Sequence, residues 1–185
     1  MQLGFVSTMR SGMWTLAFVV AASALAFAQT IDVRPLARDG QLLVSFEVRD
    51  AITSDVEAAI QSGLPTTFTY DVELRRGSAT WVDRTLDTAR VVVTVRFDNL
   101  TRRYQVSLTQ DGRVEQVHVT EDLDVVRQWC SAFTRLPLFS TRDLEANAEY
   151  YIRVRGRTKP RNSMFSLPWD RTGVAGSAKF TFLPR

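Results

Sequence analysis

Cysteine and histidine are nearly absent from this sequence, which contains one of each, Cys130 and His118. A single cysteine cannot form an internal disulfide, so we expect no disulfide partner. Zinc sites rich in cysteine or histidine are excluded as well. A serine–histidine–aspartate relay would need His118, but this residue lies in a predicted strand with no Gly-x-Ser-x-Gly turn near it. These absences favour a protein without a metal, a cofactor or a catalytic site.

Lysine is also scarce. The chain has 21 arginines and 2 lysines, which nearly balance 20 aspartates and glutamates and leave a formal net charge of +3. Nucleic-acid binding depends on a strong positive field, so this small net charge argues against a nucleic-acid partner. The nine glycines are dispersed, and none belongs to a pattern that would surround a phosphate group.

Residues 1–28 have the pattern of a secretory signal peptide. Arg10 precedes an apolar run from Met13 to Ala28, and this run is shorter than the roughly 20 residues that a membrane-spanning helix needs. Ala26 and Ala28 place small residues at the two positions that signal peptidase recognises. We expect cleavage after Ala28 and a mature chain that is periplasmic or secreted. The alternative is that the segment is retained as a membrane anchor.

Residues 29–185 predict a single β-rich globular domain, long enough to bury a core without disulfides or metals. Alternating apolar and polar residues predict strands at 30–36, 42–48, 66–76, 91–97, 102–108, 114–119, 150–159 and 178–182. Helical spacing predicts helices at 54–62 and 120–134. Ser54 has capping-box spacing to Glu57, and Gly63 ends the first helix.

The order of these elements favours an antiparallel immunoglobulin-like or fibronectin-like sandwich with two short helices. The alternative is an open antiparallel sheet with both helices on one face. Tyr150 follows Leu144 by six residues and precedes a late strand, which resembles the tyrosine corner of such sandwiches. We therefore expect Tyr150 to point inward with its hydroxyl hydrogen-bonded to the backbone.

Five segments of the sequence carry a family resemblance: Leu43–Phe46, Ala58–Phe68, Trp81–Arg84, Phe97–Tyr104 and Leu136–Leu138. Together they resemble an uncharacterised exported bacterial family labelled domain of unknown function 4390. The resemblance covers nearly all of the mature chain. It implies no activity and no catalytic residue. It also implies genes beside that of a nitrogen-type sensor kinase, which suggests a periplasmic regulatory partner of a membrane kinase.

One group of residues stands out as a candidate binding site. Alternation along one strand should place Tyr151, Arg153, Arg155, Arg157 and Lys159 on the same face. Positions two apart lie about 7 Å from each other, within the Debye length of roughly 8 Å at physiological salt, so these charges act together. Either acids on the neighbouring strand neutralise them, or they bind an anionic partner.

Two carboxylates offer a competing hypothesis. Asp71 and Glu73 share a strand face, as the acid pair of a glycosidase might, but Arg75 lies on that face too. Cross-strand ion pairing explains this pattern more simply than hydrolysis does.

These observations favour an exported, non-catalytic binding or envelope-assembly domain whose partner is an anionic envelope component or a membrane protein. The alternatives are the kinase partner and a hydrolase using dispersed carboxylates.

Overall fold

The computed structural model describes residues 31–77, 84–160 and 174–183. Its elements are β1 (Ile31–Arg38), β2 (Gln41–Val48), α1 (Ser54–Gln61), β3 (Thr66–Arg76), β4 (Arg84–Asp98), β5 (Arg103–Gln110), β6 (Arg113–Thr120), α2 (Leu123–Ser131), β7 (Ala132–Ser140), β8 (Glu149–Pro160) and β9 (Val174–Thr181). Two segments discussed from the sequence, the predicted signal peptide at 1–28 and Trp81–Asp83, lie outside the described residues.

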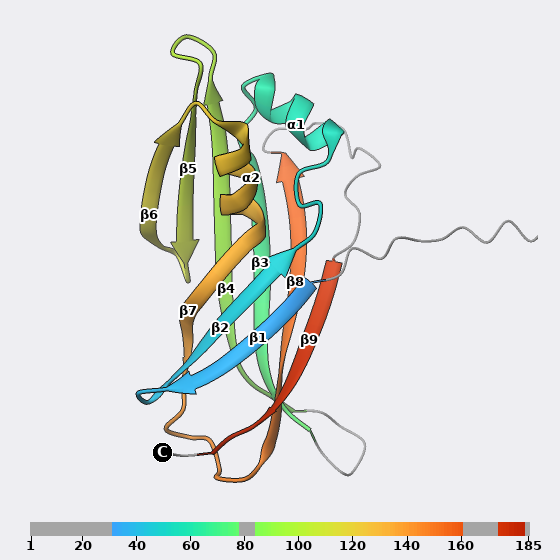
Figure 1. The fold of residues 1–185 in the computed structure, drawn as a ribbon, viewed down its shortest axis with the longest axis vertical. Helices are drawn as coiled ribbons and strands as arrows, with labels where there is room; N and C mark the ends of the chain where they lie inside the picture. The colour runs from blue at the N-terminus through green and yellow to red at the C-terminus, as the bar shows by residue number, and fades with distance from the viewer. Residues whose placement is uncertain (1–30, 78–83, 161–173, 184–185) are drawn as a thin grey trace, which may run out of the picture.

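The strands form two antiparallel sheets. One has six strands in the order β6-β5-β4-β3-β8-β9, and the other has three in the order β1-β2-β7. The small sheet crosses over one face of the large sheet, and both helices lie at one end of the molecule (Figure 1). The prediction of a mainly β, sandwich-like fold with two short helices is confirmed.

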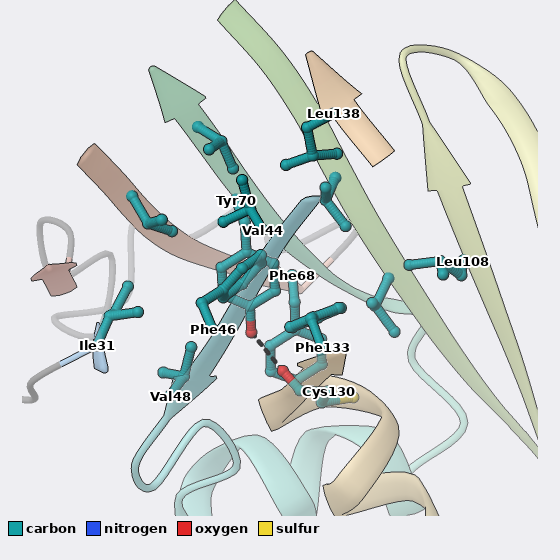
Figure 2. Packing of buried hydrophobic residues seen from close by; sticks show 14 of the residues in the cluster. Ile31, Val44, Phe46, Val48, Phe68, Tyr70, Leu108, Cys130, Phe133 and Leu138 are labelled. Carbon is teal, nitrogen blue, oxygen red and sulfur yellow. Dashed lines mark hydrogen bonds between the residues drawn. The ribbon is translucent and has the colours of Figure 1, made fainter. Parts of the chain in front are cut away.

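The core lies between the two sheets because alternate residues of each strand point to the shared side. From β3, Phe68, Tyr70, Val72 and Leu74 are all buried. Figure 2 shows the tyrosine ring beside Phe46 of β2 and Phe133 of β7; the ring centroids lie 5.4 and 5.0 Å from it. The Tyr70 hydroxyl donates a hydrogen bond to the Cys130 carbonyl at the end of α2. The intervening residues of β3 must therefore face away from the core.

The start of α1 differs by one residue from the sequence prediction. Thr53, not Ser54, is the N-cap, and its hydroxyl accepts a hydrogen bond from the Val56 amide. Either hydroxyl can cap a helix, and the extended backbone of Thr53 decides between them. The end agrees to within one residue, because the helix ends at Gln61 with Ser62 as its C-cap, and Gly63 adopts a φ of +83°.

The second helix is shorter than predicted, and a strand was missed. α2 ends at Ser131, and residues 132–140 form β7, which pairs with β2. Phe133, which the predicted helix at 120–134 included, therefore lies in a strand. Pro137 concealed the strand, because proline lacks an amide donor and is tolerated only on edge strands. β7 is one of the two edge strands of the three-stranded sheet.

Tyr150 behaves as the corner pattern predicts. Its side chain is buried, and the Glu145 amide donates a hydrogen bond to its hydroxyl over 2.8 Å. Two strands begin earlier than their alternation indicated, β4 at Arg84 and β9 at Val174. Among the helices of the described ranges, none is long and apolar enough to cross a membrane.

Candidate anion-binding surface

The outer face of the large sheet carries charged side chains from three neighbouring strands. β3 contributes Asp71, Glu73 and Arg75, which alternate with its buried residues. β8 lies along one side of β3, and β4 lies along the other. In the ladder, Asp71 is opposite Arg155 of β8 and Arg90 of β4. We name five residues the arginine surface: Arg75, Arg90, Arg153, Arg155 and Arg157.

Each of the two β3 carboxylates contacts two of these arginines. Asp71 accepts from Arg90 Nε at 2.8 Å through Oδ1 and from Arg157 through Oδ2. Glu73 contacts Arg75 at 3.6 Å and Arg155 at 3.4 Å. The Glu73 and Arg75 side chains are only 17% and 18% exposed. The carboxylates therefore hold four guanidinium groups in place on a half-buried face.

The ionisation of Asp71 reflects these contacts. Partial burial disfavours its charged form, but hydrogen bonds from Arg90 and Arg157 outweigh that effect and hold the pKa of the carboxyl below its ordinary value. The same hydrogen bond raises the pKa of the Arg90 guanidinium. An Asp71 that stays ionised is suited to orienting arginines. Donating a proton, as a general acid does, would need a raised pKa.

The structure brings together most of the residues that the sequence predicted as a candidate binding site on β8. Arg153, Arg155 and Arg157 alternate with buried Val154 and Gly156 along β8. Tyr151 lies at the N-terminal end of this group. The Arg75 guanidinium is 5.6 Å from the centre of its ring, a cation–π distance. Lys159 is opposite Thr67 in the ladder, but its side chain lies outside the described part of the chain.

The neighbouring strand does supply acids, but too few to neutralise the surface. Asp71 and Glu73 stand against five arginines. Asp111 adds a third carboxylate beside Arg90, because it accepts a hydrogen bond from the Arg90 amide at 2.7 Å. Glu149 adds a fourth, since it alternates with Tyr151 along β8. Arg153 is half-buried and makes no ion pair with any described residue. The surface therefore keeps an excess of positive charge that is greatest near β8.

Sequence reasoning missed Arg90 as a member of this surface. Alternation around Val91 and Val93 shows that Arg90 faces outward, but only the register between β3 and β4 places it beside Asp71. That register depends on side-chain packing between strands distant in sequence.

The other candidate features give weaker evidence of a functional site. His118 stacks on Trp129 of α2 with ring centroids 5.4 Å apart, and no cluster of metal-ligating groups occurs among the described residues. A hollow of about 130 Å³ on the small sheet is lined by Asp32, Arg34 and Glu47, among others. Ordinary ligand pockets measure about 300–1,000 Å³. The arginine surface is therefore the stronger candidate.

The fold and this surface define a mainly β protein of two antiparallel sheets with guanidinium groups concentrated on one outer face. The chain belongs to the family described as Domain of unknown function (DUF4390), whose model matches residues 28–162. That range includes both helices and strands β1 to β8, and the resemblance seen in the sequence is confirmed. No curated protein and no solved structure matches the chain.

Proposed function

We propose that this chain is an exported, non-catalytic domain that binds an anionic envelope component through the arginine surface. The chemical class is a phosphate-bearing polymer or lipid head group. Guanidinium groups pair with phosphate through two parallel hydrogen bonds, and are better suited to this than lysine ammonium groups. The observation that carries the proposal is the excess of arginines over carboxylates on one face, with Arg153 outside every described ion pair.

Pre-organisation supports the same reading. Arg155 and Arg157 are held by Glu73 and Asp71, so they lose less side-chain freedom when a ligand binds than mobile arginines would. A ligand phosphate near Arg153 would meet one unpaired guanidinium flanked by oriented ones. No bond-breaking step is needed for this function.

The test measures binding of soluble polyphosphate, and of vesicles with and without an anionic phospholipid. We expect binding to polyphosphate, to anionic vesicles or to both, and the arm that responds identifies the source of the phosphate. Binding should fall steeply towards half-molar salt, where the screening length is roughly half its physiological value. Absence of binding in low salt, or binding insensitive to salt, would overturn the proposal.

Arg153→Ser is the informative variant because Arg153 holds no carboxylate in place. One guanidinium near an anionic surface contributes about 1 kcal/mol, so we expect about fivefold weaker binding with an unchanged melting temperature. Arg34→Ser is the matched control; Arg34 belongs to an exposed pair with Asp32 on the small sheet. Equal loss in both variants would mean that only net charge matters.

A further inference from the structure

The turn between β4 and β5 presents an almost fully exposed leucine. Leu100 is 95% exposed, whereas the next most exposed large hydrophobic residues among those described, Val114 and Leu183, reach 64%. The turn projects beyond both helices at one end of the molecule (Figure 1). An isolated apolar residue on a surface needs no explanation by itself. Its place in the turn of a protruding hairpin, and the groups around it, make it informative.

The turn is held in one conformation. The Asp98 carboxylate accepts hydrogen bonds from the Leu100 amide at 2.9 Å and the Thr101 amide at 3.3 Å. Below the turn, the rings of Phe97 and Tyr104 pack with centroids 4.6 Å apart. An ordered hairpin therefore presents the leucine. Moving Leu100 from water into an apolar environment costs little further conformational entropy.

The residues just behind the leucine are arginines. Arg96, Arg102 and Arg103 are all exposed, and Arg103 contacts Glu121 over 2.9 Å. Three acids lie at this end as well, Asp98, Glu121 and Asp122, so they equal the arginines in number. Leu64, 39% exposed, belongs to the turn after α1, which meets the hairpin where Gly63 lies against Asn99.

From this arrangement we infer that the β4–β5 turn is a membrane-contacting tip that inserts Leu100 into the apolar boundary of a lipid bilayer. An apolar point with guanidinium groups behind it matches the bilayer interface, where acyl chains lie beneath phosphate head groups. Arginine can keep its charge among head groups while its stem lies against apolar surface. The inference concerns a different surface from the arginine surface and does not depend on it.

Partitioning onto sedimented vesicles of zwitterionic and of anionic lipid tests this inference. We expect Leu100→Ser to partition about tenfold less onto both, a change that corresponds to ~1.4 kcal/mol. Leu183→Ser, which removes an exposed leucine near the opposite end, should partition as the wild type does. Leu100→Ser should bind polyphosphate normally, which separates this inference from the proposed function. Equal partitioning of wild type and Leu100→Ser, or no partitioning of the wild type, would overturn it.

A second measurement locates the leucine directly. Cys130, the one native cysteine, is buried and free, so Leu100→Cys supplies the reactive thiol for an environment-sensitive dye. The dye at position 100 should shift to shorter emission wavelength when vesicles are added, and the dye on Leu183→Cys should not. A dye at position 100 that stays in an aqueous environment, or one that shifts no more than at 183, would contradict the inference.

Discussion

Asp71 shows how one residue organises the arginine surface. Its carboxylate receives Arg90 from β4 and Arg157 from β8, and it thereby joins three strands by side chains as well as by backbone ladders. Removing either arginine would leave a half-buried carboxylate with fewer donors. Charge changes at Arg157 or Arg155 are therefore expected to affect stability as well as binding, which is why Arg153 is the cleaner probe.

We predict that Asp71→Asn lowers the free energy of unfolding by about 1–2 kcal/mol at pH 7, because charged hydrogen bonds to two arginines are lost from a partly screened site. The pKa of Asp71 is below its ordinary value of 3.8 in the folded state. Its stabilising contribution is therefore complete above the unfolded pKa and is lost as pH falls through the folded pKa. Urea unfolding from pH 7 to pH 2 should show the two proteins converging only below about pH 4.

Asp32→Asn is the control for this experiment, since Asp32 pairs with Arg34 at an exposed site and should change stability by less than about 0.5 kcal/mol. A stability difference between wild type and Asp71→Asn that persists unchanged at pH 2 would show that the carboxylate charge is not the cause.

At the scale of elements, the backbones of the two sheets come into close contact where β1 meets β9. A Cβ added to Gly176 would lie 2.1 Å from the Ile31 carbonyl oxygen. Because Gly176 has no side chain, the backbone of β9 can pass directly beside the backbone of β1. Any larger residue would block this approach. β9 also pairs with β8, so this contact links the small sheet to the strand that carries most of the arginine surface.

We predict that Gly176→Ala destabilises the protein by at least about 2 kcal/mol, since the added methyl group can only be accommodated by moving one of the two strands. Thermal unfolding followed by circular dichroism would measure this. Gly77→Ala is the matched control, because no atom of the described residues lies within 4 Å of a Cβ at Gly77; we expect a change within about 0.5 kcal/mol. Similar melting temperatures for Gly176→Ala and wild type would show that β1 and β9 can move apart without loss of stability.

For the molecule as a whole, the expected export decides where the arginine surface and the hairpin tip would act. In the functions proposed above, both would act on envelope components outside the cytoplasm. This expectation depends on residues 1–28, whose apolar run and small residues at Ala26 and Ala28 have the signal-peptide pattern.

We predict that the exported protein begins at Gln29, because signal peptidase would cleave after Ala28. N-terminal sequencing or intact-mass measurement of protein from the periplasmic or secreted fraction would check this. Recovery of the full-length chain in the membrane fraction would instead support retention of the segment as an anchor.

Local sequence determined most of the individual elements. Alternation determined which face of β3 is buried, and Asp111-Gly112 specified the turn between β5 and β6, where both residues have positive φ. The spacing of Tyr150 from Leu144 indicated that its side chain is buried and that its hydroxyl is hydrogen-bonded to the backbone. These features depend on a few neighbouring residues, so they can be predicted without knowing the rest of the fold.

Only the tertiary structure decided how these elements combine. It placed β8 beside β3, so that Arg157 meets Asp71, and β4 on the other side, so that Arg90 does too. It also made a strand of residues 132–140 despite Pro137, because β2 offered an edge for pairing. The strand period specifies a face but not a neighbour, whereas the order and register of strands follow from packing between segments distant in sequence.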